Sequence, residues 1–202
     1  TYHCVSTPLA KYRVYGLTGN WKAIYHTGCP SIDIAHAALA SPPVIVEELG
    51  GVGPRIDLSQ PFMVILQHPV TQEADDAADQ LRITLAACRQ VTLPQLYFWP
   101  GQDAGAEHMA KVVREYREAH PAQTFHAVRN LPPLRFLRLL RQATVLVGNS
   151  SAGIRECSHL GTPVVNIGSR QQGRERAMNV RDVPHEVAAI REAVVAQRTH
   201  GR

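Results

Sequence analysis

Cysteine is scarce in this sequence, and the few cysteines are far apart. Four occur among 202 residues (Cys4, Cys29, Cys88 and Cys157), and none belongs to a Cys-x-x-Cys pair. The ten histidines show no metal-ligand spacing such as His-Glu-x-x-His. These absences argue against a disulfide framework and against a metal centre. They predict reduced, buried thiols in a cytoplasmic protein.

Long apolar runs and blocks of one charge are also missing. The longest apolar stretches, such as 62–66 and 144–147, are far too short to span a membrane. The 21 basic residues exceed the 17 acidic ones, but they are dispersed, and aromatic residues make up only 6% of the chain. The sequence therefore predicts neither a membrane protein nor a nucleic-acid-binding protein. No secretory leader is visible, and Thr1 opens what reads as a strand, so we expect a fragment whose N-terminus lies upstream.

From residue 61 onward, short apolar runs alternate regularly with amphipathic stretches. The expected strands are 62–67, 95–99, 124–127, 144–147 and 164–167, and the expected helices are 73–90, 104–120, 133–142, 154–160 and 186–197. Strands of four to six apolar residues separated by amphipathic helices are typical of a parallel sheet covered on both sides. The predicted class is α/β, a Rossmann-like parallel sheet with helices on both faces.

The first part of the chain reads differently. Residues 1–40 alternate between strand and helix patterns, as at the end of another α/β domain. Prolines and glycines then interrupt residues 41–57, which is typical of an exposed connection between domains. We therefore predict three parts: the end of a first Rossmann-like domain (1–40), a linker (41–57) and a C-terminal Rossmann-like domain (58–202).

The most informative stretch follows the strand 144–147. The chain breaks there on the small polar turn 148–153 and reopens as a helix, which leaves free backbone N–H groups and a positive dipole end. Such a place binds anions, phosphate above all. Ser150 and Ser151 add two hydroxyl donors at the same turn.

Two arginines, Arg170 and Arg174, follow the next strand and could neutralise a diphosphate. The alternative is an ordinary helix cap formed by Asn149 or Ser150. The adjacent serines and the arginine pair favour the anion site. In such sheets ligands bind beyond the carboxyl ends of the strands, so the turns 68–71, 100–103, 129–132, 148–153 and 168–173 share one edge.

Other polar residues have two interpretations each. His68, directly after a strand, could contact a phosphate or transfer a proton, or could simply bond a backbone carbonyl. Glu156 could accept hydrogen bonds from ribose hydroxyls, or could merely suit the start of a helix. Lys111 and Arg114, three residues apart on one helix, predict a solvated face, with a site for an anionic effector as the alternative.

Four motifs together resemble a known family. They are Gly-Cys-Pro-Ser-Ile-Asp (28–33), Gln-His-Pro-Val-Thr (67–71), Gly-Asn-Ser-Ser-Ala-Gly-Ile-Arg-Glu (148–156) and Gly-Thr-Pro-Val-Val-Asn-Ile-Gly-Ser-Arg-Gln-Gln-Gly-Arg (161–174). The chain resembles the UDP-N-acetylglucosamine 2-epimerases, and within them the hydrolysing branch. The Asp-Ser-Gly-Gly and Gly-His-Arg-Arg-Glu motifs typical of the non-hydrolysing branch are absent. One loop departs from the family, because Gly101 stands where Asn is usual.

The resemblance implies a GT-B-type fold of two Rossmann-like domains, with this chain forming mainly the C-terminal, UDP-binding half. It implies elimination of UDP from UDP-N-acetylglucosamine, followed by hydration to N-acetylmannosamine for the synthesis of sialic-acid-type sugars. No metal or other cofactor is implied. The family's catalytic carboxylates lie mostly in the first domain, upstream of Thr1, so the isolated chain should be inactive. The whole protein would self-associate as a homo-oligomer.

The resemblance also assigns roles to individual residues. Ser150 and Ser151, with Gly153 of the same turn, would bind the diphosphate, while Glu156 would bind the ribose. Arg170 would contact the nucleotide, and Asn130 would contact the uracil. His68, the catalytic candidate, would lie at the diphosphate and sugar.

Two other functions remain open from the sequence. A GT-B glycosyltransferase would use the same edge to bind its donor, and a nucleotide-sugar sensor would bind without catalysis. The sugar could be N-acetylglucosamine or a 2,4-diacetamido relative, because the residues that contact it lie mostly upstream.

Overall fold

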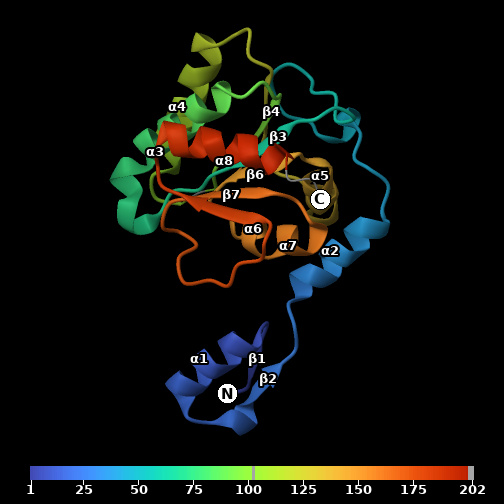
Figure 1. Cartoon of the computed structure of the whole chain (residues 1–202), viewed down its shortest axis with the longest axis vertical. Coiled ribbons are helices and arrows are strands. Elements are labelled where there is room, and N and C mark those ends of the chain that lie inside the picture. Colours follow the sequence, from blue (N-terminus) through green and yellow to red (C-terminus); the bar gives the residue numbers. More distant parts are fainter. Residues whose placement is uncertain (102, 200–202) are drawn as a thin grey trace.

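The structure is a computed structural model that describes residues 1–101 and 103–199. Its first part contains β1 (His3–Val5), α1 (Pro8–Thr18), the 3₁₀ helix η1 (Trp21–Ala23) and β2 (Ile24–His26). The two strands pair in parallel. This part stands apart from the main body in Figure 1, joined to it by the segment that leads into α2 (Pro30–Ala40).

The main body is built on a six-stranded, all-parallel sheet. Its strands are β3 (Met63–Leu66), β4 (Gln95–Phe98), β5 (Phe125–Val128), β6 (Val145–Gly148), β7 (Val164–Ile167) and β8 (Val180–Val183). They lie in the order β5-β4-β3-β6-β7-β8, which is the Rossmann order. The predicted α/β class is confirmed.

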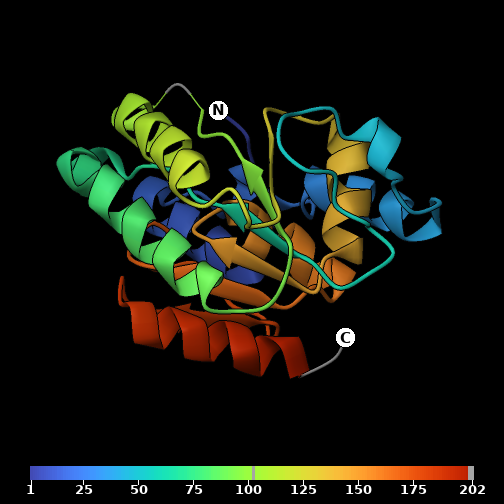
Figure 2. The ribbon, with the colours of Figure 1, turned by 90° about the horizontal axis from the view of Figure 1, so that it is seen from above.

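Helices cover both faces of this sheet (Figure 2). One face packs on α3 (Ala77–Arg89), α4 (Ala106–Ala119) and α8 (Val187–Thr199), and the other on α2, α5 (Pro133–Gln142), α6 (Ser151–Ile154) and α7 (Glu156–Leu160). Strands β3 to β7 are fully buried. Their predominantly apolar sequences follow from this double coverage.

Three local features differ from the sequence-based expectation. Strand β8 was not expected, because its sequence Val-Arg-Asp-Val lacks an apolar run and it lies at the edge of the sheet. The expected helix 154–160 is two short helices, α6 and α7, separated by a kink at Arg155. The expected helix 73–90 opens with a 3₁₀ segment, η3 (Thr71–Asp76), before α3 begins.

The segment 41–57 is exposed at most of its residues, its prolines and glycines included, but it is also anchored to the main body. Val44, Leu49 and Ile56 are buried in the core, and Val52 exchanges two backbone hydrogen bonds with Ala127 of β5. Tight packing of backbone on backbone explains Gly51, because a Cβ there would collide with the carbonyl oxygen of Ala127.

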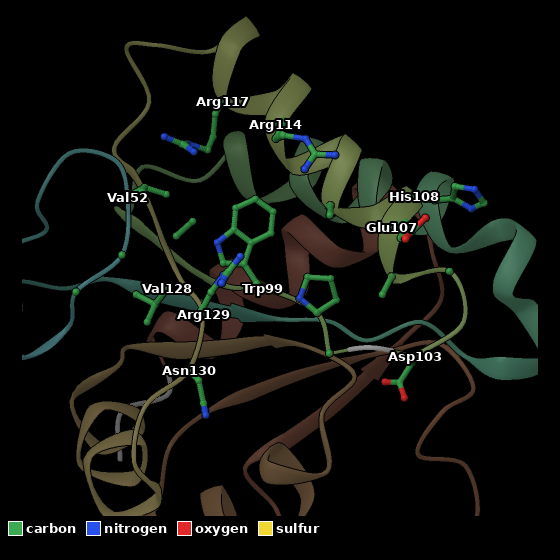
Figure 3. A pocket seen from close by; sticks show the side chains of 18 of the residues that line it. Val52, Trp99, Asp103, Glu107, His108, Arg114, Arg117, Val128, Arg129 and Asn130 are labelled. Carbon is green, nitrogen blue, oxygen red and sulfur yellow. The ribbon is translucent and has the colours of Figure 1, made fainter.

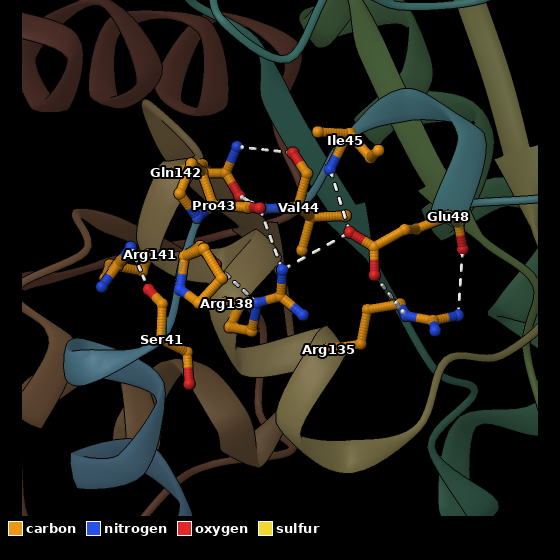
Figure 4. A network of polar contacts seen from close by, with 10 residues as sticks. Ser41, Pro43, Val44, Ile45, Glu48, Arg135, Arg138, Arg141 and Gln142 are labelled. Atoms are coloured by element: carbon orange, nitrogen blue, oxygen red, sulfur yellow. Dashed lines mark hydrogen bonds and ion pairs between the residues drawn. The ribbon is translucent and has the colours of Figure 1, made fainter.

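Figure 4 shows how α5 holds this segment. Arg138 donates to the carbonyls of Pro42 (2.6 Å) and Pro43 (2.9 Å), and the Gln142 amide bonds both the N–H and the C=O of Val44. Arg141 donates to carbonyls at the end of α2. Helix α2 also packs on α5 and α7, although the sequence groups it with residues 1–40. The predicted division at residues 40 and 57 stays a prediction.

Candidate functional site

The candidate site lies where strands β3 and β6 end side by side. From these two central strands the chain continues in opposite directions, toward β4 on one side and toward β7 on the other. A crevice forms at such a switch point beyond the carboxyl ends of the strands, and ligands of open α/β sheets bind there. The turns that carry His68 and Ser150 leave the sheet at this point.

Asn149 is the structural centre of the site. It is fully buried, and its side chain bonds both backbone groups of His68: Oδ1 accepts from His68 N (2.8 Å) and Nδ2 donates to His68 O (2.8 Å). This pairing ties the β6 turn to the β3 turn. The sequence by itself suggests only a helix cap at Asn149. Its position directly after a buried strand was the available signal.

Gly148 permits the close approach of these two turns. Its φ is +139°, and a Cβ at this position would collide with the carbonyl of Leu66. Only glycine adopts such a backbone in contact with a neighbouring strand without strain. The glycine of the motif is therefore required by the backbone of the switch point.

The two serines open α6. Ser150 is the N-cap, and its Oγ accepts from Ala152 N at 3.3 Å. Ser151 is the first helical residue. Because α6 is a single turn that ends at the Arg155 kink, a helix dipole contributes little here. Anion binding at this turn would therefore depend on hydroxyls, local N–H groups and nearby cations.

The loop after β7 brings a cation to the same turn. Arg170 Nη1 and Gln171 Nε2 both donate to the carbonyl oxygen of Asn149, at 3.2 Å and 2.7 Å. Gln171 is 1% exposed, and its Oε1 has no hydrogen-bond partner among the described residues. Arg174 lies elsewhere, in a hollow that also contains Arg13 of α1. The structure thus brings Arg170, and not Arg174, to the serine turn.

His68 is half-buried beside this loop. Burial lowers the pKa of its imidazole below the usual value, the positive charge of Arg170 lowers it further, and Asp103 opposes them. The lowered pKa favours the neutral imidazole, which has one nitrogen that can donate and one that can accept a hydrogen bond. Both roles expected of His68, phosphate contact and proton transfer, are chemically available to this form.

Glu156 begins α7 and is 7% exposed. Its Oε1 accepts from Arg155 Nη2 at 3.3 Å, whereas its buried Oε2 has no hydrogen-bond partner among the described residues. Buried carboxylate oxygens are normally hydrogen-bonded, so this oxygen can accept from a bound hydroxyl. Gly153 instead faces the sheet, since a Cβ there would lie 2.8 Å from Val164 Cγ1. It allows α6 to pack closely on β7.

Asn130 lies at a separate part of the same edge. It follows β5, which two strands separate from β6, a distance of about 14 Å at ordinary strand spacing. Its Oδ1 accepts from the N–H of Leu131, and the rest of the side chain is exposed. The structure therefore does not bring Asn130 together with the serines. A ligand that contacts both must be elongated along the edge.

Asn130 lines a cavity of about 1340 Å³ between α4, the 49–52 segment and the ends of β4 and β5 (Figure 3). Gly101, the departure from the family motif, lies in the same wall, while Gln102 lies outside the described residues. Arg114 and Arg117 extend from α4 on the side that faces Trp99.

Lys111, the other half of the predicted basic pair, is exposed and 3.8 Å from Glu115. Arg114, three residues further along α4, lines the cavity. An effector site at this pair stays a prediction.

The N-terminal part contacts the loop after β7. Thr7 Oγ1 donates to Glu175 Oε2 at 2.5 Å, and Arg13 donates to the carbonyl of Gly173 at 2.9 Å. A hollow of about 680 Å³ lies between this part and α6–α7, with Cys29 and Arg155 in its walls. Across residues 1–101 and 103–199, no group of three or more metal-binding side chains gathers and no helix is long and apolar enough to cross a membrane.

Comparison with known proteins gives a consistent result. The family described as UDP-N-acetylglucosamine 2-epimerase matches residues 1–200. The chain is 30% identical over 189 residues to UDP-N,N'-diacetylbacillosamine 2-epimerase (hydrolyzing) of Legionella pneumophila, covering 94% of this chain and 48% of that protein. It is 26% identical over 192 residues to UDP-N-acetylglucosamine 2-epimerase of Neisseria meningitidis, with 95% and 48% coverage. The chain thus spans about half the length of these relatives.

Solved structures share the fold. UDP-GlcNAc 2-epimerase of Methanocaldococcus jannaschii in complex with UDP-GlcNAc and UDP superposes with a TM-score of 0.70 at 13% identity, covering 98% of this chain and 54% of that one. A UDP-N-acetylglucosamine 2-epimerase structure from Rickettsia bellii gives a TM-score of 0.61, covering 100% and 52%. Because the family match extends over nearly the whole chain and the fold agrees with it, this chain belongs to the UDP-N-acetylglucosamine 2-epimerase family.

Proposed function

We propose that this chain is the nucleotide-binding part of a hydrolysing UDP-sugar 2-epimerase, which converts UDP-N-acetylglucosamine and water into N-acetylmannosamine and UDP. The observation that carries the proposal is the convergence at the β3–β6 switch point. Ser150, Ser151, His68 and Arg170 meet there, held together by Asn149. Hydroxyls, a neutral imidazole and a guanidinium form a site suited to a diphosphate.

In this proposal the diphosphate lies at the serine turn and the nucleoside extends along the edge. The free Oε2 of Glu156 accepts from the ribose, and the Asn130 loop, about 14 Å away along the sheet, contacts the uracil. The two ends of one elongated nucleotide can thus occupy turns that the sheet keeps apart. This division of roles is taken from the resemblance at the level of motifs.

The proposed reaction has two steps. A base removes the proton at C2 while the bond between C1 and the diphosphate oxygen breaks, which forms 2-acetamidoglucal and UDP. Water then adds across the C1–C2 double bond, with the opposite configuration at C2. Residues of this chain stabilise the negative charge that develops on departing UDP. The base that the first step requires belongs, by resemblance, to the other domain of the whole protein.

A second sugar substrate is favoured by the names of the relatives. Two of them, from Legionella pneumophila and Campylobacter jejuni, are named for UDP-N,N'-diacetylbacillosamine or its GDP counterpart and for hydrolysis. A 2,4-diacetamido sugar is therefore the alternative substrate of the same reaction. Incubating the full-length protein with each UDP-sugar and identifying the products separates these candidates. Free 2-epimerised sugar plus UDP supports the proposal, whereas transfer to an acceptor identifies a glycosyltransferase.

The binding site is tested by titrating UDP into the full-length protein and into its Ser150→Ala/Ser151→Ala variant by calorimetry. Loss of hydrogen bonds to a charged group weakens binding by about 1.5–3 kcal/mol for each, so we expect at least a tenfold loss of affinity. Asp75→Ala, an exposed acidic residue of η3, serves as the control. Equal affinity of the double variant and the wild type would contradict the phosphate assignment, and no reaction with any UDP-sugar would point to a sensor.

A further inference from the structure

Glu73 makes an unexpected set of contacts next to the candidate site. It lies in η3, the segment that follows the β3 turn, at a residue with non-helical backbone angles (φ −127°, ψ 27°). Its Oε1 accepts a short hydrogen bond from Ser169 Oγ, and its Oε2 accepts from Gln80 Nε2 at 2.7 Å. These hydrogen bonds favour the ionised form and lower the pKa of the carboxyl.

The contact with Ser169 connects two turns that are not neighbours in the sheet. Glu73 follows β3 and Ser169 follows β7, while β6 lies between these strands. The Glu73–Ser169 hydrogen bond therefore spans the turn that carries Asn149 and Ser150. Together with the Asn149 contacts, it links the turns after β3, β6 and β7 into one unit.

Ser169 is the residue directly before Arg170, and its other neighbour is also fixed. Gly168 has a φ of +75°, and the His185 ring packs where a Cβ would stand. Both Ser169 and Arg170 are exposed, so little packing restrains them. A hydrogen bond at Ser169 thus restricts the part of the loop from which the Arg170 side chain starts.

A carboxylate so close to an anion site needs an explanation, because its charge repels a bound phosphate. The contacts supply one. Both oxygens of Glu73 are used as hydrogen-bond acceptors for the loop and for α3, so its benefit is geometric. An arginine held in place before binding loses less conformational entropy when the ligand arrives.

We propose that Glu73 is a positioning residue that holds Ser169 and thereby keeps Arg170 over the serine turn for the phosphate groups of the nucleotide. This inference rests on the proposed function. Glu73 itself does not touch the ligand.

The test measures UDP affinity by calorimetry in the full-length protein. Glu73→Ala and Ser169→Ala should each weaken binding by roughly three- to tenfold, the cost of ordering one or two mobile side chains. Combining them should add little, since they remove the same hydrogen bond. Glu73→Gln should bind within about twofold of the wild type, because an amide oxygen can still accept from Ser169. Its NH₂ can donate to Gln80 Oε1, which has no partner among the described residues.

A double-mutant cycle separates positioning from a general structural effect. In an Arg170→Ala background, Glu73→Ala should change the affinity by less than about twofold, because the group that it positions is gone. Asp75→Ala, on the same segment, is the matched control and should bind like the wild type. Unfolding curves of each variant confirm that the proteins compared are folded. If Glu73→Ala fails to fold, Ser169→Ala, at an exposed residue, replaces it in the cycle.

Several results would overturn the inference. One is wild-type UDP affinity in both Glu73→Ala and Ser169→Ala. Another is a Glu73→Ala change that lowers UDP affinity equally in the presence and in the absence of the Arg170 side chain. If Glu73→Gln binds UDP as weakly as Glu73→Ala, the charge of Glu73 matters for binding and its hydrogen-bond geometry does not. If Ser150→Ala/Ser151→Ala loses affinity while the Glu73 variants do not, the proposed function stands and only this inference falls. If the wild type binds no UDP, both fall.

Discussion

Replacing Asn149 tests the structural centre of the site most directly. In Asn149→Ala the two 2.8 Å hydrogen bonds to the N–H and C=O of His68 are lost at a position with no solvent exposure. Leaving a buried backbone group without a partner costs about 1–3 kcal/mol. For two such groups, with partial relaxation, we expect a loss of about 2–5 kcal/mol in the free energy of unfolding.

The assay is equilibrium urea unfolding of the full chain, with UDP affinity measured in parallel. Asn130→Ala is the matched control for the unfolding measurement, because Asn130 is exposed and its side chain accepts from the N–H of the next residue. Its free energy of unfolding should lie within about 0.5 kcal/mol of that of the wild type. Asn149→Asp keeps the acceptor for His68 N but loses the donor for His68 O, so it should also destabilise the protein. The loss of stability in Asn149→Asp should be smaller in acid, where the protonated carboxyl can again donate a hydrogen bond.

A loss below about 0.5 kcal/mol in Asn149→Ala would refute the reasoning, because the two hydrogen bonds would then contribute nothing measurable. Reduced UDP affinity in a stable, folded Asn149→Ala protein would instead show that the side chain organises the site beyond its contribution to stability.

Three further predictions concern backbone, titration and the 41–57 segment. Gly148→Ala should lower the free energy of unfolding by more than about 2 kcal/mol and abolish UDP binding, since its Cβ would meet the Leu66 carbonyl. Gly16→Ala, with open space around it, should leave stability unchanged or slightly raised. Unfolding curves and UDP titrations of both variants decide this. His68 has a pKa below 6.5 in the folded protein, so acid favours the unfolded state, which binds the proton more strongly. Stability should therefore fall as the pH drops below about 6.5, and His68→Gln should reduce this slope by at most about 1.4 kcal/mol per pH unit; an unchanged slope would contradict the assignment. Arg138→Ala should destabilise the protein by about 1–3 kcal/mol and speed amide exchange in residues 41–49, because Arg138 bonds two carbonyls of that segment; unchanged exchange would show that other contacts suffice to hold it.

The sequence predicted the sheet well and its edge poorly. Strands β3 to β7 are buried on both faces, so each appears as a mostly apolar stretch that a reader of the sequence can identify, although β4, β5 and β7 each include one buried polar residue (Gln95, His126 and Asn166). Strand β8 is half-exposed, and its pairing includes a 2.6 Å hydrogen bond from Asn166 Nδ2 to Asp182 Oδ1. A hydrogen-bond partner 16 residues away in the chain produces no periodic pattern in the sequence.

Turn composition described residues 41–57 only in part. Prolines and glycines there predicted an exposed connection, and these residues are exposed, but they also let the backbone lie against β5 and α5 (Figure 4). Glycine permits a flexible chain and also permits close contact between backbones. Distant groups decide between these possibilities, among them Arg138 and Gln142 of α5 and Ala127 of β5, and sequence order does not show that they face this segment.

The sequence alone determined which residue types stand at the ends of the strands, because strand lengths and small polar turns are local properties. It placed His68, Ser150, Ser151 and Arg170 on one edge. The tertiary structure decided which of them meet. Strand order brings the β3 and β6 turns together at the switch point, keeps Asn130 three strands away, and lets Glu73 reach Ser169 across β6. Pairings between strands depend on long-range burial and backbone hydrogen bonding, which no single stretch of sequence contains.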